Sequence, residues 1–168
     1  MNFSSTEASY LKYVSQVLGA RQVLLPESLE TRENKWKQAF HTRTGYLPED
    51  LQFDLIVVNF AHTATESLFN AQTDDLYQKM KIAMKLQDKR ILEVDTSLSD
   101  IDDICRMMTE VIDCPYLLFF NHETTDSEIK TKSAYRVLQT FSPAVLLKTP
   151  EKKKIVWDSL QILMRAIG

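Results

Sequence analysis

Six polar side chains suited to catalysis or ligand binding follow four short apolar runs of this chain of 168 residues. They are Asn59, His62, Asp95, Asn121, His122 and Ser142. An imidazole titrates near neutral pH, so either histidine could act as a general acid or base, although an isolated loop histidine is more often only solvated. Ser142 would need an adjacent base to act as a nucleophile. It precedes Pro143 and lacks the glycines of a nucleophile elbow, which favours a hydroxyl bonded to the backbone of a turn.

The four apolar runs are predicted strands. They span residues 53–60, 90–95, 115–120 and 135–140, and helical patterns lie after the first, second and last of them, at residues 73–85, 99–111 and 150–167. Strands that alternate with helices form a parallel sheet covered on both faces. The sequence therefore predicts a three-layer α/β/α domain with a four-stranded, mainly parallel sheet. Ligands of such sheets bind in the loops that follow the carboxyl ends of the strands.

The first fifty residues carry weaker patterns. Residues 6–18 have the spacing of an amphipathic helix that ends at Gly19, and a short helix is predicted around residues 33–40, followed by a loop. We therefore expect residues 1–50 to form an N-terminal helix and a loosely attached arm, and residues 51–168 to form the α/β domain.

Composition argues against several classes of site. The two cysteines, Cys105 and Cys114, and three scattered histidines make a zinc site or an iron–sulfur cluster unexpected. Only three glycines are present, so no phosphate-binding glycine loop is expected, and neither is a nucleotide or dinucleotide cofactor. Unpaired thiols, without a signal peptide or an apolar run of membrane length, indicate a cytoplasmic protein.

The charge distribution favours protein partners. The net charge of -3 gives no reason to expect a broad nucleic-acid surface, which must neutralise several phosphates. One basic patch is present, formed by Lys148, Lys152, Lys153 and Lys154. Cations near the start of a helix are unfavourable because they face the positive end of the helix dipole, so their presence there favours a binding role for the patch. The alternative is that these lysines only form a solvated helix face.

The C-terminal part of the chain combines a strand end, a proline-containing loop and the start of a helix in one motif. Its residues are Thr140, Phe141, Ser142, Pro143, Ala144, Leu146, Leu147, Pro150, Lys153, Trp157, Asp158 and Leu160. The motif resembles that of the uracil-DNA glycosylase superfamily, where Thr-aromatic-His-Pro-Ala precedes Leu-Leu, Pro, Lys and a Trp-Asp-x-Leu helix. A second match comprises Asn59, Phe60, Ala61, His62, Thr63, Phe69, Leu76, Lys79 and Met80. The resemblance covers residues 54–165 and implies a glycosylase-like fold.

Two departures from this family bear on activity. In its active enzymes a carboxylate of the first loop positions or activates water, and a histidine of the last loop stabilises charge on the departing base. Phe60 and Ser142 stand in those places. Each lost group commonly contributes roughly two to four orders of magnitude in rate, so the resemblance implies a scaffold without catalysis. Phe69 stands where the family stacks an aromatic ring on a flipped base, although packing explains an aromatic there equally well.

A Ser-Pro pair ahead of a Pro-x-x-Lys-x-x-x-Trp helix is similar to the psi subunits of bacterial DNA polymerase III. Those subunits form a family of glycosylase-like fold without catalytic residues. The resemblance implies a replication protein that joins the clamp loader to the chi subunit, which contacts single-stranded DNA-binding protein. It also implies that a short N-terminal segment binds the clamp loader. Leu18, Gly19 and Pro26 match that segment, and Val23 stands where it usually carries an aromatic residue. The partner-binding residues expected here are Tyr10, Leu11, Leu18, Val23 and Pro26.

Two other functions remain open from the sequence. A divergent base-excision enzyme could have moved its catalytic groups to Asn59, His62 or Asp95. A regulator that binds DNA ends through Lys148 and residues 152–154 is less favoured, because the net charge is acidic. A retained ligand pocket would be lined by Asn59, His62, Phe69, Asp95, Asn121 and Ser142.

Overall fold

The computed structural model describes residues 29–45 and 51–168 of the chain. Its helices are α2 (Leu29–Ala39), α3 (Ala71–Ala83), α4 (Ile101–Thr109), α5 (Pro143–Lys148) and α6 (Lys153–Ile167), with a short 3₁₀ turn, η1 (Pro150–Lys152). Its strands are β1 (Phe40–Thr42), β2 (Leu55–Phe60), β3 (Ile91–Thr96), β4 (Tyr116–Asn121), β5 (Lys130–Lys132) and β6 (Tyr135–Phe141). The helix predicted at residues 6–18 lies outside the described residues.

The described strands form one mixed sheet of six strands in the order β1-β3-β2-β4-β6-β5. The α/β class is confirmed, and the four predicted strands are the four central ones, which pair in parallel. The predicted strand number is wrong, because β1 and β5 add antiparallel edges to this parallel centre. These two edge strands have only three residues each, FHT and KTK, too short to show an alternating pattern.

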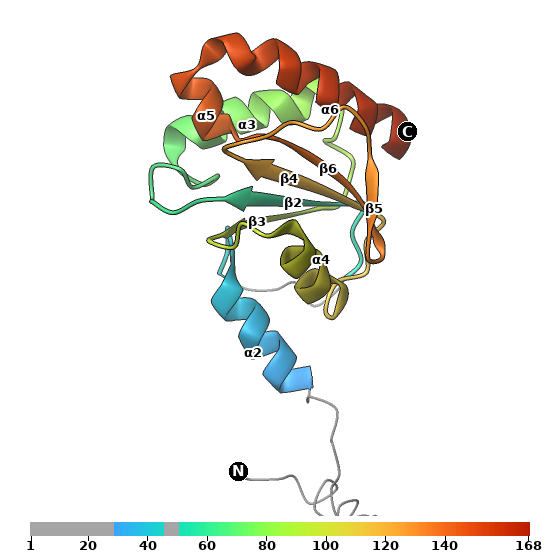
Figure 1. The fold of residues 1–168 in the computed structure, drawn as a ribbon. Coiled ribbons are helices and arrows are strands. Elements are labelled where there is room, and N and C mark those ends of the chain that lie inside the picture. The colour runs from blue at the N-terminus through green and yellow to red at the C-terminus, as the bar shows by residue number, and fades with distance from the viewer. Residues whose placement is uncertain (1–28, 46–50) are drawn as a thin grey trace, which may run out of the picture. The chain divides into compact units, whose positions relative to one another are not determined.

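Helices cover both faces of the sheet (Figure 1). α3 and α6 lie on one face, and α4 lies on the other. The two faces form separate apolar clusters, so that Leu55 and Val57 of β2 pack under α3 and α6, whereas Ile56 and Val58 pack towards α4. A strand buried on both faces needs a continuous apolar run, which explains the sequence of β2.

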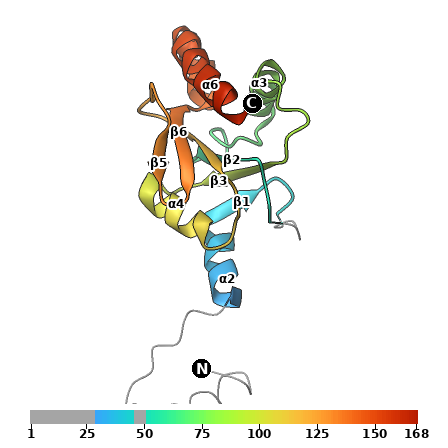
Figure 2. The ribbon, with the colours of Figure 1, turned by 90° about the vertical axis from the view of Figure 1, so that its right-hand side faces the viewer.

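Part of the predicted N-terminal arm belongs to the α/β unit, which spans Arg32–Gly168. β1 pairs with β3 at the edge of the sheet (Figure 2). The side chains of Trp36 and Phe40 are each 2% exposed and belong to the core beside α4. The compact unit therefore begins well before residue 51, because these two aromatic side chains are buried against the sheet.

The segment that joins β6 to α6 is more helical than expected. Residues 144–148 of the predicted proline-containing loop belong to α5, whose first turn is capped by Ser142 and begins with Pro143. The Thr149 hydroxyl donates its proton to the Val145 carbonyl oxygen at 2.7 Å and so does not cap the last helix, which was predicted from residue 150. The last helix therefore starts later, at Lys153 after the 3₁₀ turn. None of the helices in residues 29–45 and 51–168 has the length and apolarity needed to cross a bilayer.

Candidate functional site

The order of the strands puts the ligand crevice expected of an open α/β sheet at the carboxyl ends of β2 and β4. These neighbouring parallel strands send the chain in opposite directions, β2 towards β3 and β4 towards β6. Loops that diverge in this way leave an opening between them, where open α/β sheets bind ligands. Residues 61–70 follow β2 and residues 122–129 follow β4, so these two loops border the crevice.

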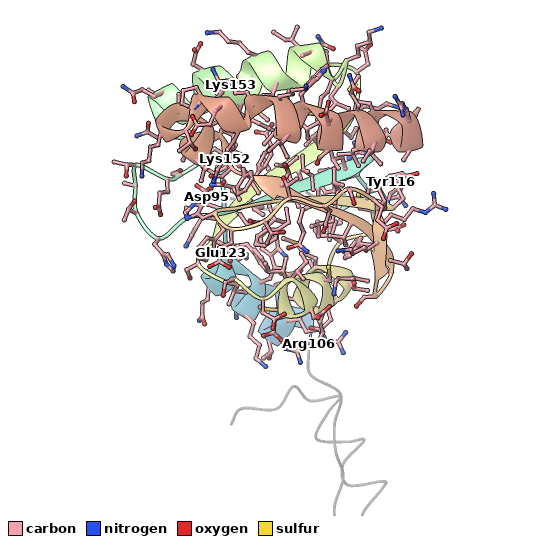
Figure 3. The ribbon with its side chains drawn as sticks, turned by 45° about the horizontal axis from the view of Figure 1, so that its top comes forward. Asp95, Arg106, Tyr116, Glu123, Lys152 and Lys153 are labelled. Atoms are coloured by element: carbon pink, nitrogen blue, oxygen red, sulfur yellow. The ribbon has the colours of Figure 1, made fainter. Side chains whose placement is uncertain are left out.

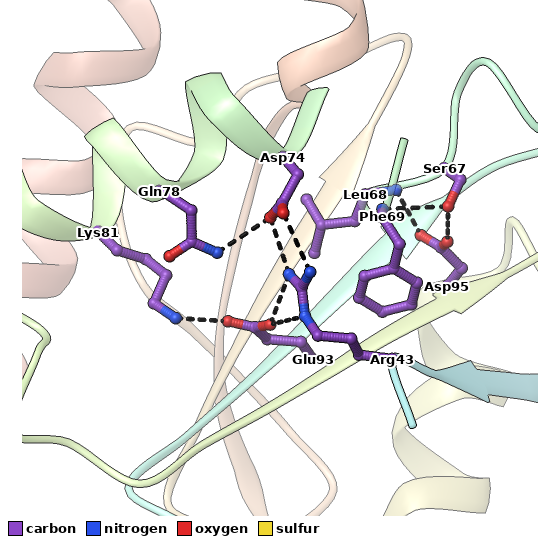
Figure 4. Close-up of polar contacts among 9 residues, drawn as sticks. All are labelled: Arg43, Ser67, Leu68, Phe69, Asp74, Gln78, Lys81, Glu93 and Asp95. Atoms are coloured by element: carbon purple, nitrogen blue, oxygen red, sulfur yellow. Dashed lines mark hydrogen bonds and ion pairs between the residues drawn. The ribbon is translucent and has the colours of Figure 1, made fainter. Parts of the chain in front are cut away.

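Asn59 and Asp95 fix the first of these loops. Asn59 is fully buried, and its Nδ2 donates to Asp95 Oδ1 at 2.8 Å and to the Glu66 carbonyl oxygen at 3.0 Å. Asp95 also accepts hydrogen bonds from the Leu68 backbone N–H at 2.9 Å and from the Ser67 hydroxyl (Figure 4). The two predicted site residues therefore lie side by side, but their bonds hold the backbone of the loop. Neither is placed to attack a ligand in the crevice.

Glu66 and His122 approach one another across the crevice. His122 Nδ1 lies 4.0 Å from Glu66 Oε1, and both side chains are mostly buried. The backbone N–H of His62 donates to Glu66 Oε2 at 2.9 Å and is the main cause that lowers the pKa of this carboxyl. His122 and Lys148, which lie nearby, lower this pKa further, against the opposing effect of burial. Glu66 is therefore held as a carboxylate beside the His122 ring, at a separation longer than a hydrogen bond.

Phe60 forms the apolar floor of this pair. Its ring meets the His62 ring edge-on at a centroid distance of 4.4 Å and the His122 ring at 5.1 Å. Both loop histidines named from the sequence thus lie at the site, packed on one aromatic ring. Phe60 occupies the position where the resemblance would put a carboxylate, and its side chain offers no group that could activate water.

A hollow of about 200 Å³ opens beside the His122 ring. Phe60, Phe119, Asn121, His122 and Gln139 contribute to its wall. Asn121 Oδ1 accepts hydrogen bonds from the backbone N–H groups of Glu123 and Thr124, both at 2.8 Å. Asn121 Nδ2 and His122 Nε2 are buried and have no protein partner. A buried donor without a partner is costly, so this wall suits a small polar ligand that accepts from Asn121.

Ser142 has a structural role. Its side chain is fully buried, and its Oγ accepts from the Val145 backbone N–H at 3.3 Å as the N-cap of α5. Its own backbone N–H donates to the Asn121 carbonyl oxygen at 2.8 Å. The interpretation of this hydroxyl as a backbone-bonding group is confirmed. The same bonds remove Ser142 from the accessible wall of the predicted pocket.

Phe69 packs against a charged network centred on Arg43 and does not line the predicted ligand pocket. The Arg43 guanidinium lies 4.8 Å from the centre of its ring. Arg43 also bonds both oxygens of Asp74, at 2.8 and 3.0 Å, and Glu93 Oε2 at 3.2 Å (Figure 4). The hydrogen bonds to Asp74 chiefly raise the pKa of Arg43, which is already always charged. The position of Phe69 is therefore accounted for by packing against Arg43.

Sequence reasoning missed the two residues that organise this region most, Glu66 and Arg43. Glu66 lies in the loop after β2, and no pattern in the sequence distinguishes it from its polar neighbours. Arg43 gave no signal, because its partners lie on α3 and β3. Within residues 29–45 and 51–168 no group of three His, Cys, Asp or Glu side chains is arranged to hold a metal ion. The predicted partner-binding residues Tyr10, Leu11, Leu18, Val23 and Pro26 lie outside the described part of the chain.

The chain matches no protein-family model and has no significant match among curated proteins.

Proposed function

We propose that this protein is a non-catalytic interaction subunit with a uracil-DNA glycosylase-like fold, most similar to the psi subunits of bacterial DNA polymerase III. One observation carries the proposal: the two positions that would hold catalytic groups hold structural ones. Phe60 is an aromatic ring packed between two imidazoles. Ser142 is a fully buried helix cap.

The arrangement of the elements supports the glycosylase-like part of the proposal. Phe60 ends β2 and Ser142 follows β6, both at the carboxyl ends of parallel strands. Asn121, at the end of β4 between them, bonds to Ser142 through its backbone. The motif residues therefore lie together at the carboxyl ends of the parallel strands, as an ancestral site would require. A replication subunit of this kind would act in the cytoplasm and bind the clamp loader and the chi subunit.

Co-purification from native cells tests the psi-like role. A tagged chain should capture clamp-loader and chi subunits, because a binding protein is defined by its partners. The matched control carries Leu18→Asp and Val23→Asp in the N-terminal segment and should lose the clamp loader. Capture of neither subunit by a chain with an accessible tag contradicts the psi-like assignment.

The Glu66–His122 pair favours a second candidate, a divergent base-excision enzyme with relocated catalytic groups. The sequence suggested Asn59, His62 or Asp95 for this role, but Asn59 and Asp95 are engaged with each other and with the loop backbone. Glu66 is ionised beside His122, and the hollow next to this imidazole has room for a small polar group. An ionised carboxylate at this place is the group that a relocated water-positioning site would need.

A glycosylase assay on DNA that contains uracil, hypoxanthine or xanthine separates the two candidates. The interaction-subunit proposal expects no turnover. Turnover that is lost in Glu66→Gln, His62→Ala or His122→Ala, and kept in His41→Ala, would reverse the ranking. His41 is the matched control, because it is the remaining histidine and lies exposed on β1.

A further inference from the structure

Four lysines lie between two exposed aliphatic side chains in the stretch of chain from the end of α5 to the first turn of α6. We call this the lysine surface; it comprises Leu147, Lys148, Lys152, Lys153, Lys154 and Ile155. Leu147 is 44% exposed and Ile155 is 50% exposed, so both side chains offer apolar area to a partner. Lys152 and Lys153 lie at the same end of the molecule as Asp95 and Glu123 (Figure 3). The lysine surface therefore adjoins the loops of the candidate site.

The lysine surface carries more positive than negative charge, with four lysines and one carboxylate between Leu147 and Ile155. Elsewhere on the α/β unit Arg43, Lys79, Lys81, Arg106, Lys130 and Lys132 each have a carboxylate within 3.2 Å. None of the four lysines here is in such an ion pair, and Glu151 is the one carboxylate in the segment between Leu147 and Ile155. The first turn of α6 also lacks an acidic residue and a side-chain cap. Lysine charges and helix dipole thus add to one positive field.

The contacts of Lys148 and Lys152 hold part of this charge in place. Lys152 Nζ lies 4.0 Å from the centre of the Phe141 ring, the last residue of β6. Lys148 is close enough to Glu66 for its charge to lower the pKa of that carboxyl. Lys153 and Lys154 are exposed, and no such contact restrains them. A ligand could therefore recruit these two lysines first, at little cost to the fold.

The mixture of side chains distinguishes between possible partners. A phosphate backbone is bound by charge and hydrogen bonds and gains nothing from exposed leucine or isoleucine. An acidic peptide segment with large apolar side chains matches both features, since its carboxylates would face the lysines and its apolar groups would cover Leu147 and Ile155.

We infer that the lysine surface binds an acidic segment of a partner protein that carries large apolar side chains. The inference rests on the proposed interaction role and adds where one partner binds and what its chemistry is. It is independent of the N-terminal segment that would bind the clamp loader. The two interactions can therefore be lost separately.

Fluorescence anisotropy with the full chain and a labelled probe peptide tests this inference. The probe is an aspartate-rich peptide that carries leucines, compared with the same peptide with serine for leucine and with oligothymidylate of the same length. Lys153→Glu with Lys154→Glu should weaken peptide binding roughly tenfold at low salt, because two attractions become repulsions. Acidic residues in the first turn of α6 favour the helix, so this variant remains folded. Lys85→Glu with Lys89→Glu makes the same charge change elsewhere and should leave binding unchanged.

A variant and a matched control also test the apolar side chains of the lysine surface. Ile155→Ser should weaken binding of the leucine peptide roughly threefold to tenfold and leave the serine peptide unaffected. Ile82→Ser removes an isoleucine that is 61% exposed on α3 and should change neither. Preferential binding of oligothymidylate, or equal binding by all variants, would overturn the inference. The native co-purification would still decide the proposed function, because it reports on the clamp-loader and chi subunits directly.

Discussion

At the scale of single residues, Glu66 makes the stability of the protein depend on pH. The His62 N–H and, to a smaller extent, the His122 and Lys148 charges lower the pKa of Glu66 below its ordinary value of 4.5. A carboxyl whose folded pKa is lowered stabilises the fold fully above its unfolded pKa, and the contribution is lost as the pH falls through the folded pKa. We therefore expect Glu66→Gln to be less stable than the wild type at neutral pH, with a smaller loss of stability below pH 4.5.

Urea unfolding at a series of pH values measures this dependence. Glu128→Gln is the control, because Glu128 is exposed in the loop between β4 and β5. Its stability should follow the wild type at every pH. Parallel curves for Glu66→Gln and the wild type would contradict the assigned role of Glu66.

Arg43 is the residue that joins β1, β3 and α3. Its guanidinium bonds Asp74 in α3 and Glu93 in β3, and Glu93 is only 11% exposed. Arg43→Met leaves these carboxylates with fewer partners while it keeps the aliphatic stem. Because Arg43 is itself 41% exposed, solvent screens the pairs, and we expect a loss of about 1–2 kcal/mol in the free energy of unfolding.

Arg106→Met provides the matched comparison in denaturant titrations. Arg106 pairs with Asp103 one helical turn away, and both side chains are more than half exposed. Such pairs contribute about 0.5 kcal/mol or less. Equal losses for the two variants would show that the Arg43 network adds nothing beyond a surface ion pair.

At the scale of elements, α2 contributes to the core through Trp36. The indole ring lies 5.1 Å from the Phe40 ring, and its Nε1 donates to Met108 Sδ of α4 at 3.3 Å. Truncation of a buried tryptophan removes a large apolar surface and leaves a cavity. Trp36→Ala should therefore cost about 3–5 kcal/mol, and Lys37→Ala, on the exposed side of the same helix, less than about 0.5 kcal/mol. Thermal and urea unfolding measure the free energy of unfolding of both variants. A decrease of less than about 1 kcal/mol for Trp36→Ala would mean that α2 contributes little to the core.

The central strands could be predicted from sequence because their runs of apolar residues are long enough to show burial. β1 and β5 could not, since three residues with exposed lysine or histidine side chains carry no pattern. The sequence predicted that Asn59, Asp95 and Asn121 lie near one another, because the carboxyl ends of neighbouring parallel strands lie on the same side of a sheet. The Glu66–His122 pair could not be foreseen, because it requires β2 and β4 to be neighbours, and strand order depends on tertiary packing.

At the scale of the whole molecule, the unit of residues Arg32–Gly168 should fold without the residues that precede α2. The buried apolar side chains of the described residues run from Trp36 to Leu163, on both faces of one sheet. A chain that begins at Leu29 keeps all of them. We therefore expect its free energy of unfolding, from urea titration, to lie within about 1 kcal/mol of that of the full chain.

The same shortened chain tests whether the two proposed interactions are separate. It lacks Tyr10, Leu11, Leu18, Val23 and Pro26, so it should lose the clamp loader in co-purification. It keeps the lysine surface and should bind the acidic probe peptide as the full chain does. Removal of α6, with the buried Leu160 and Leu163, is the control that must abolish cooperative unfolding. If the chain from Leu29 also fails to unfold cooperatively, residues before α2 are part of the folding unit, because the core from Trp36 onward would then be insufficient.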